Sequence, residues 1–493
     1  MLELIVFLCG AAVMVLEMVG ARVLAPYLGT SIVVWTSLIG VILASLSLGY
    51  WWGGRLADKN PSRRALGLII LFAAVFVGCV AGAKAYVLEF LQHHAKDLHL
   101  GSTLANLILF APPSVLLGMV SPYAVRLKLS ELARSGRTVG NLYAISTVGS
   151  IVGTFVAGFV LIAWFGSTQI LIGIAGLLAV CSLLCAGTQR LAKVLVLLLL
   201  LLGCLAARLY DDYLAGFGFF DLDTAYSRVL VFNSRHTATD RPVRVMTTAP
   251  KRVQSAMFHD DPLDLVLEYT RFFNLAWHFK PDIRRGLVLG GGGYSFPKHA
   301  LAAHPELWLD VVEIDPGITA LARRFFALED DPRLAINHED ARTFVNRAHE
   351  PYDAVFVDAF GTHYSVPFHL TTVEFAGRVR ELLADDGVAI LNTICAVEGD
   401  GGRFLRAELA TYRTVFPQVF VFALEGPFKG EEVQNVLLVA FKTQRQVSFE
   451  DPDPELSVFL AKRWPRPIPL DLPPLTDEHA PVDRYVTTLA AVL

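Results

Sequence analysis

Four consecutive glycines, Gly290 to Gly293, precede an acidic residue, Glu313, by about 20 residues. Glycine lets a backbone turn tightly and approach a ligand without a Cβ atom in the way. A carboxylate at the end of the next strand can accept hydrogen bonds from both ribose hydroxyls of a nucleoside. The loop lacks both the spacing of dinucleotide-binding loops and the lysine of a Walker loop. The pair therefore predicts a nucleoside site that favours an S-adenosyl compound over NAD or ATP, because such a compound has no pyrophosphate.

Short apolar runs of strand length surround these residues and alternate with sequence of helical character. The runs lie at 287–289, 309–314, 354–357 and 388–391. This rhythm predicts a doubly wound parallel sheet in which the glycines follow the first strand and Glu313 ends the second. Strand-like alternation at 226–232 and 243–247 and a helix-length stretch at 263–279 come before it. We therefore expect a Rossmann-like, class I methyltransferase-like α/β domain at 281–493, preceded by a small β region and helix at 221–280.

The first 207 residues hold the apolar excess of a chain that is 54% hydrophobic overall. A membrane-spanning helix needs about 20 apolar residues. Six stretches meet this requirement, at 4–24, 30–52, 65–83, 103–125, 139–164 and 168–187. A seventh, at 194–207, is weaker because its uncharged core is only about 14 residues long, which fits either a short span or an interfacial helix. The sequence thus predicts a multi-pass helical membrane domain at 1–207, then a linker at 208–220.

Clusters of Lys and Arg follow the second, fourth and sixth predicted spans, and short loops rich in these residues lie in the cytoplasm. The basic residues are Arg55, Lys59, Arg63, Arg64, Arg126, Lys128, Arg134, Arg137, Arg190 and Lys193. This pattern places the N-terminus inside as well. A true seventh span would put the soluble domain outside, whereas an interfacial segment would leave it in the cytoplasm. We expect a multi-pass protein of the cell (inner) membrane with a cytoplasmic catalytic domain, and the sequence leaves this sidedness open.

Polar and small residues inside the spans carry separate predictions. Glu17 is a carboxylate within the first span, which is costly in lipid and is either a contact for a cation or amine or an ion pair with Arg22. Small residues at four-residue spacing let helices approach closely, so we expect them to pack helices together. They are Ser45, Gly49 and Gly53 in one series and Gly149, Gly153 and Ala157 in another.

Cysteine usage and charge exclude several other functions. Five of the six cysteines fall in apolar segments, only Cys395 lies in the soluble part, and none has metal-ligand spacing. We therefore expect no metal site and no disulfide. The net charge of −4 comes with no basic stripe interleaved with aromatic residues, so we expect no nucleic-acid partner. The expected partners are the lipid bilayer, a small-molecule amine and a second copy of the chain in a homodimer.

Several short motifs then occur in one order along the soluble half. They are Val253-Gln254-Ser255, the glycine segment Leu287 to Ser295, Val312 to Pro316, Asp331-Pro332-Arg333, Asp340-Ala341 and Tyr352 to Asp358. In this order, residues from about 224 to 440 resemble spermidine synthases, the polyamine aminopropyltransferases, and the whole chain resembles their membrane-fused bacterial relatives. The resemblance implies an enzyme that transfers an aminopropyl group from decarboxylated S-adenosylmethionine to a polyamine-type amine and releases methylthioadenosine, with no tightly bound cofactor.

The resemblance also implies roles for individual residues. Gln254 and Glu313 would hold the adenosine sugar beside the loop glycines, and Asp340 with Ala341 would contact adenine; the loop residues concerned are Gly290, Gly291 and Gly292. Asp358 would be the proton acceptor. An aliphatic amine is mostly protonated near neutral pH and must lose a proton before it attacks carbon, and a carboxylate at the carboxyl end of a parallel strand is well placed to take it. The alternative for Asp358 is a buried acid with a structural role.

The acceptor side of the site departs from the resemblance. Gly293 and Gly361 stand where the family carries two amine-binding aspartates, and Arg271 replaces a carboxylate in the segment that begins at Tyr269. Each lost carboxylate removes a charge-assisted bond to a dicationic amine. Tyr269 and His363 are the acceptor-side residues that we predict. Further replacements for the missing acids are sought among Glu374, Glu398 and Asp400.

Three functions are compatible with these residues. The first is aminopropyl transfer, which the nucleoside residues and the proton acceptor favour. The second is methyl transfer from S-adenosylmethionine, which the missing acids favour and for which a cation such as Arg271 would suit the carboxylate of the donor. The third is a membrane transporter or sensor that binds the nucleoside without turnover. We rank them in that order.

Overall fold

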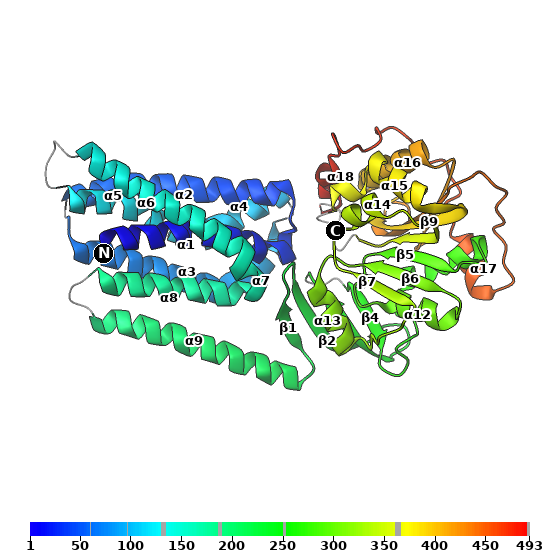
Figure 1. Cartoon of the computed structure of the whole chain (residues 1–493), viewed down its shortest axis with the longest axis horizontal. Helices are drawn as coiled ribbons and strands as arrows, with labels where there is room; N and C mark the ends of the chain where they lie inside the picture. The colour runs from blue at the N-terminus through cyan, green and yellow to red at the C-terminus, as the bar shows by residue number, and fades with distance from the viewer. Residues whose placement is uncertain are drawn as a thin grey trace. The chain divides into compact units, whose positions relative to one another are not determined.

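The computed structural model describes residues 1–59, 61–95, 97–129, 135–185, 190–249, 253–359 and 366–490. The chain divides into two compact units, Met1–Arg228 and Val229–Leu493. The first consists of helices, ending in the short strand β1 (Phe220–Asp223), and the second alternates strands and helices (Figure 1). Each unit has its own buried hydrophobic cluster, as expected for separately folded bodies.

Six of the described helices in the first unit are long and apolar enough to cross a membrane. They are α1 (Leu2–Leu28), α2 (Ile32–Lys59), α3 (Arg63–His94), α6 (Ser135–Val156) with its continuation η2 (Ala157–Leu161) and α7 (Ile162–Trp164), α8 (Ser167–Leu184) and α9 (Arg190–Gly216). A bent pair, α4 (Leu98–Leu109) and α5 (Ala111–Lys128), makes a seventh span if it is counted as one. The chain thus has the helices of a multi-pass membrane protein.

Two helical segments differ from the prediction. The single span expected at 103–125 is broken, and its two parts meet at an angle of 54°. Prolines at the start of α5 explain the break, because proline has no N–H to continue the helical bonds and disfavours helical backbone in the residue before it. Helix α9 continues to Gly216, through much of the segment at 208–220 that the sequence assigned to a linker. Its part from Val194 to Gly216 is long and apolar enough to cross a membrane.

Glycines bring pairs of helices in the first unit into backbone contact, as the small-residue spacing predicted. A Cβ atom on Gly149 would lie 2.1 Å from the carbonyl oxygen of Phe7, which joins α6 to α1. A Cβ atom on Gly49 would lie 2.2 Å from the carbonyl oxygen of Val115, and this close approach joins α2 to α5.

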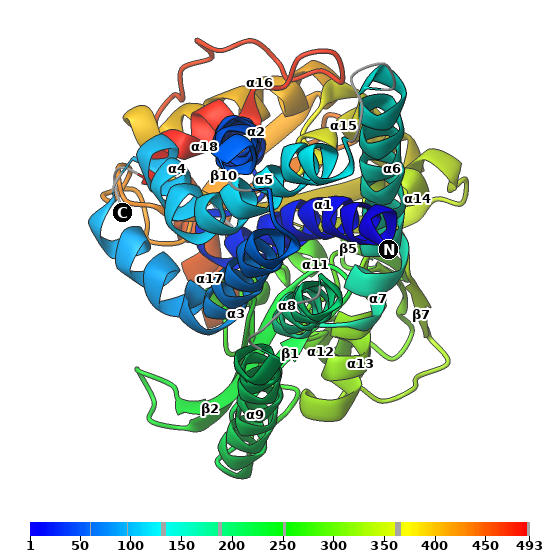
Figure 2. The ribbon, with the colours of Figure 1, turned by 90° about the vertical axis from the view of Figure 1, so that its left-hand side faces the viewer.

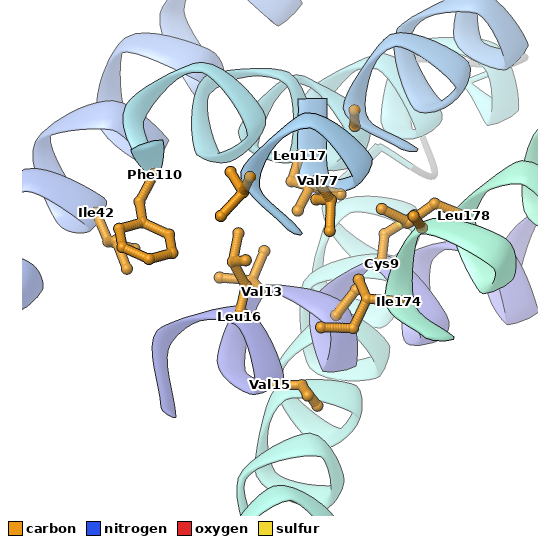
Figure 3. Close-up of a cluster of buried hydrophobic side chains, with 14 of the residues drawn as sticks. Cys9, Val13, Val15, Leu16, Ile42, Val77, Phe110, Leu117, Ile174 and Leu178 are labelled. Carbon is orange, nitrogen blue, oxygen red and sulfur yellow. The ribbon is translucent and has the colours of Figure 1, made fainter. Parts of the chain in front are cut away.

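In the view along the helices, α1 lies among the other helices and α9 at the edge (Figure 2). Apolar side chains such as Leu16 fill the centre (Figure 3).

A polar junction closes one end of the first unit. The guanidinium of Arg22, near the end of α1, donates to the carbonyl oxygen of Ile162 at 2.8 Å and lies 3.6 Å from the carboxylate of Asp223, which follows α9. Arg228 donates to the hydroxyl of Tyr27, also near the end of α1, at 3.2 Å. Arg22 therefore does not form the ion pair with Glu17 that the sequence offered as one alternative, because the segment after α9 supplies its partner.

The second unit begins with strands β2 (Arg228–Arg235), β3 (Pro242–Thr247) and β4 (Ser255–Phe258), which pair antiparallel. The stretch predicted as one helix at 263–279 forms two short helices, α10 (Glu268–Phe272) and α11 (Leu275–Phe279). These strands form the small β region expected before the main sheet.

The main sheet has seven strands in the order β10-β11-β9-β8-β5-β6-β7. They are β5 (Arg285–Leu289), β6 (Trp308–Val312), β7 (Leu334–Asn337), β8 (Tyr352–Val357), β9 (Leu383–Cys395), β10 (Gln418–Ala423) and β11 (Gln434–Phe441). Strands β5 to β9 are parallel to one another, whereas β11 runs antiparallel to both of its neighbours, β9 and β10. The doubly wound sheet is confirmed, and the sequence missed β7 and the antiparallel pair.

Helices cover both faces of this sheet (Figure 1). Helices α14 (Ala341–Arg347), α15 (Val373–Leu382) and α16 (Arg403–Val415) pack over one face. Helices α12 (Ser295–Ala303), α13 (Pro316–Phe325) and α17 (Pro454–Ala461) pack over the other. The strand order reverses on either side of β5, and ligands of such sheets bind beyond the carboxyl ends of the strands at that point.

Candidate active site

The glycine loop joins β5 to α12 at the point where the strand order reverses. Gly290 has a φ of +106° and Gly292 a φ of +50°, values that L side chains rarely adopt. A Cβ atom on Gly290 would also lie 2.3 Å from the carbonyl oxygen of Asp358, which follows β8. The glycines are therefore required both by backbone conformation and by the close approach of the two strand ends.

Glu313 directly follows β6 and closes the glycine loop from the side. Its Oε2 accepts from the N–H groups of Gly291, at 2.9 Å, and Gly292, at 3.1 Å, and its Oε1 accepts from Asp315 N–H at 3.0 Å. Burial raises the pKa of Glu313, although these three N–H groups act in the opposite direction. Because each carboxylate oxygen can accept two bonds, Oε1 keeps an acceptor position for a ribose hydroxyl.

Asp358 is held by two side-chain donors. The hydroxyl of Tyr269, in α10, donates to Oδ2 at 3.0 Å, and the amide of Asn392, in β9, donates to Oδ1 at 2.9 Å. Burial raises the pKa of Asp358, while the donors Asn392 and Tyr269 act to lower it. A carboxyl with a raised pKa is a better proton acceptor than an ordinary exposed carboxylate. The structure thus joins two predicted residues, Tyr269 and Asp358, in one contact.

Asp340 and Ala341 lie at the start of α14, after the neighbouring strand β7. The Oδ1 of Asp340 accepts from Thr343 N–H at 3.0 Å, and its Oδ2 lies 3.0 Å from Nε2 of His369. Burial acts to raise the pKa of Asp340, but these two groups outweigh it and the pKa lies below the ordinary value. The Asp340 carboxylate therefore caps α14 and fixes the position of the loop in which the adenine contact is predicted.

Gln254 stands directly before β4, next to the glycine loop. Its Oε1 is buried and accepts no hydrogen bond within the residues that the structure describes. A buried acceptor that lacks a donor costs free energy, so this oxygen is available to a ligand hydroxyl. The next residue, Ser255, accepts from Gly293 N–H at 2.8 Å and ties β4 to the loop.

Residues 269–427 match the family model described as the spermine/spermidine synthase domain. The C-terminal half contains a spermidine synthase domain. This synthase domain includes the glycine loop, Glu313, Asp340 and Asp358, so the resemblance seen in the sequence is confirmed at the level of the domain.

Three relatives illustrate the range of similar proteins. The polyamine aminopropyltransferase of Vibrio vulnificus is 33% identical over 200 residues, which cover 40% of this chain and 64% of the relative. Polyamine aminopropyltransferase 1 of Streptomyces coelicolor is 24% identical over 425 residues, or 80% of this chain and 75% of the relative. The N-terminal histidine N-methyltransferase of Emericella nidulans is 32% identical over 186 residues, or 36% of this chain and 31% of the relative. The chain thus spans less than two thirds of the Vibrio relative.

The acceptor side of the synthase domain differs from the nucleoside side. A Cβ atom on Gly293 would lie 2.8 Å from the Cβ atom of Ser255, so an aspartate there needs a displacement of β4. His363 and Gly361 lie outside the described residues. Arg271 pairs with Glu455 at 2.7 Å and does not stand as a free cation.

Two of the acids considered as replacements are also engaged. Glu398 lies 3.2 Å from Arg466, and the Oε2 of Glu374 accepts from Asp477 N–H at 3.0 Å. Asp400 begins the short helix η4 (Asp400–Gly402) after β9. Glu398 and Glu374 are thus each bonded to a group within the second unit.

Sequence reasoning missed two polar residues close to Asp358, Asn392 and Asn435. Asn392 donates to Asp358, and its own Oδ1 accepts from the amide of Asn435, in β11, at 3.0 Å. A signal was present, because Asn392 directly follows the apolar run at 388–391 that predicted a strand. Polar residues that end neighbouring parallel strands meet at the same edge of a sheet.

Proposed function

We propose that the synthase domain transfers an aminopropyl group from decarboxylated S-adenosylmethionine to an aliphatic amine. The observation that carries this proposal is Asp358, whose carboxyl has a raised pKa and stands next to the glycine loop that Glu313 closes. The loop that would hold the nucleoside and the carboxyl that would accept the proton thus lie together at the carboxyl ends of neighbouring strands. The curated relatives named polyamine aminopropyltransferases agree with this assignment.

The chemistry needs a proton transfer and one displacement. Asp358 accepts a proton from the ammonium group of the acceptor, which frees the nitrogen lone pair. The nitrogen then attacks the aminopropyl carbon bonded to the sulfonium, so that a C–N bond forms as the C–S bond breaks. The electron pair of the broken bond stays on sulfur, and neutral methylthioadenosine leaves. Gln254 and Glu313 would hold the ribose during this step, because both offer buried acceptor oxygens.

Product analysis tests this proposal. The purified full chain is incubated separately with S-adenosylmethionine and with its decarboxylated form, each with a panel of aliphatic diamines and polyamines. We expect methylthioadenosine, detected by mass spectrometry, only with the decarboxylated donor. If neither donor yields a product, the proposed transfer is wrong and binding without turnover becomes the better account.

Methyl transfer is the second candidate function. It is supported by the similarity to an N-methyltransferase of Emericella nidulans and by the absence of an acid at Gly293. Against it stands Arg271, the cation considered for the donor carboxylate, because this side chain is paired with Glu455. Release of S-adenosylhomocysteine from S-adenosylmethionine in the same assay would favour methyl transfer.

The proposal extends to the side of the membrane on which the synthase domain is attached. We propose that the chain crosses seven times, counting α4 with α5 as one span, and that the synthase domain follows on the non-cytoplasmic side. Within the first unit, Asp223 lies after α9 and contacts Arg22 near the end of α1, so both helices end at the same face. Arg55 lies near the end of α2 and Arg126 near the end of α5, in the loops predicted to be cytoplasmic. These loops lie at the face opposite to the one where α1 and α9 end. The sequence led us to expect a cytoplasmic catalytic domain, which six spans would give. Seven spans place this domain on the other side of the membrane.

Cysteine labelling in intact spheroplasts tests the proposed side. Phe428, whose side chain is 98% exposed, is replaced by cysteine, and Asp58, at the end of α2, is replaced in a matched control. A membrane-impermeant maleimide should label Phe428→Cys in intact cells and Asp58→Cys only after lysis, each compared with the parent chain. The reverse pattern would place the domain in the cytoplasm. On the proposed side, an S-adenosyl donor made inside the cell has to cross the membrane to reach the site.

A further inference from the structure

Three polar side chains form a row across neighbouring strands at the edge of the sheet that holds the site. Asp358 follows β8, Asn392 lies in β9 and Asn435 lies near the start of β11. Val357 is opposite Leu391 in the register, which brings Asp358 beside Asn392. The row therefore arises from strand pairing and does not depend on a loop.

The side-chain amide of Asn392 is hydrogen-bonded at both ends. The Nδ2 of Asn435 donates to the Oδ1 of Asn392 at 3.0 Å. A side-chain amide has its acceptor on oxygen and its donors on nitrogen, so the Asn392 nitrogen must face the other way, toward Asp358. It does so at 2.9 Å from Oδ1. Asn392 is only 2% exposed, so turning its amide would leave buried polar groups without partners.

We infer that Asn435 and Asn392 are positioning residues for the proton acceptor. Asn435 fixes the orientation of the Asn392 amide, and Asn392 holds the Asp358 carboxylate ionised and turned so that its remaining lone pairs face the amine. This inference rests on the proposed aminopropyl transfer. Neither asparagine touches the reacting atoms in this account, because both act through Asp358.

The direction of the pH effect follows from the groups around Asp358. Tyr269 from α10 and Asn392 from β9 are the side chains that bond its carboxylate, and no charged side chain does so among the described residues. The loop from β5 approaches through the backbone of Gly290. Burial raises the pKa of Asp358 and Asn392 lowers it, so loss of this donor raises the pKa further. Since only the ionised carboxylate accepts a proton, the acid limb of the activity profile then moves to higher pH.

The test measures kcat/KM for methylthioadenosine release against pH, with the full chain and an amine that supports turnover. Asn392→Leu and Asn435→Leu are each expected to move the acid limb upward by about one pH unit and to lower kcat/KM about tenfold on that limb. The double variant should match Asn392→Leu alone, because Asn435 acts through Asn392. The matched control is Thr393→Val, since Thr393 is equally buried in β9 but donates to the carbonyl oxygen of Val436. It should leave the profile in place.

An isosteric variant and a second measurement keep the inference testable if a leucine variant fails to fold or turnover is lost. Asn392→Asp keeps the side-chain shape but puts a second carboxylate beside Asp358, so the acid limb should move further upward. An infrared titration of the Asp358 carboxyl, identified by its loss in Asp358→Asn, should show the same shifts without turnover. Unchanged titration in Asn392→Leu and Asn435→Leu would overturn the inference, whatever the activity. Absence of methylthioadenosine from the wild-type chain would instead count against the proposed function.

Discussion

The nucleoside side and the acceptor side of the synthase domain are built in different ways. On the nucleoside side, Glu313 is bonded to three backbone N–H groups and Gly290 is required by its backbone conformation. On the acceptor side, Gly293 stands where the family resemblance implies an acid, and Arg271 is paired with Glu455. The difference teaches that backbone contacts fix the loop of the proposed nucleoside side, whereas the proposed acceptor side lacks the acid that the resemblance implied.

The largest effect is expected where the two sides meet, at Asp358. Asp358→Asn keeps the shape of the side chain but removes the proton acceptor, so kcat should fall about 10³-fold. Binding of methylthioadenosine, measured by calorimetry, should change less than about threefold, because the nucleoside contacts remain. A variant that keeps wild-type kcat would show that Asp358 is a structural acid.

A smaller effect is expected on the nucleoside side alone. Glu313→Gln removes the charge from an acceptor of three N–H bonds and puts an amide donor against the loop. The affinity for methylthioadenosine should fall about 10- to 100-fold, with kcat at saturating donor much less affected. Titration calorimetry supplies the affinity and steady-state kinetics the kcat. Equal affinities in the variant and the wild type would remove Glu313 from the nucleoside site.

Restoring the missing acid at Gly293 tests why the acceptor side differs. Gly293→Asp brings a Cβ atom to 2.8 Å from that of Ser255, so the variant should lose about 1–3 kcal/mol of stability. Ser255→Gly removes the opposing atom but also the acceptor of Gly293 N–H, so adding Gly293→Asp to Ser255→Gly should cost less stability than adding it to the wild type. Thermal unfolding of these variants gives the comparison. Full stability of the single variant would show that sterics do not exclude an acid at this position.

The smallest effect is expected from Tyr269→Phe. It removes one of the two donors to Asp358, and Asn392 contributes more than Tyr269 to lowering the pKa of that carboxyl. The acid limb of the pH–rate profile should therefore move to higher pH by less than in Asn392→Leu. A shift to lower pH would contradict the contact as described, since loss of a donor to the charged form raises a carboxyl pKa.

Local sequence motifs predicted the positions of the glycine loop, Glu313 and Asp358 in the sheet well. The glycine loop, Glu313 and Asp358 each lie at the end of a strand whose apolar run is visible in the sequence, and the structure brings them together at the carboxyl ends of neighbouring strands. Their backbone requirements are local, so a short motif carries them. The Asn392 and Asn435 contacts were missed because they join residues that are 34 and 43 positions from their partners.

Local and non-local effects both explain the differences in the first unit. The predicted span at 103–125 contains adjacent prolines. Prolines can bend the axis of a helix, and a hydropathy pattern does not reveal such a bend. The apolar run ends at the charged residues after 207, but helix α9 continues past them to Gly216. Asp211 and Asp212 lie within this helix, and charged residues near the end of a span can reach the membrane edge. The partner of Arg22 was equally hidden, since Asp223 is remote in sequence.

The most direct test of the central claim, aminopropyl transfer with Asp358 as proton acceptor, is a competition between the two donors. The full chain, wild type and Asp358→Asn, receives equal amounts of S-adenosylmethionine and its decarboxylated form with an amine that supports turnover. We predict that wild type releases methylthioadenosine with little S-adenosylhomocysteine, and that Asp358→Asn releases neither while still binding methylthioadenosine. Predominant release of S-adenosylhomocysteine by the wild type, or methylthioadenosine release unchanged in the variant, would contradict the account.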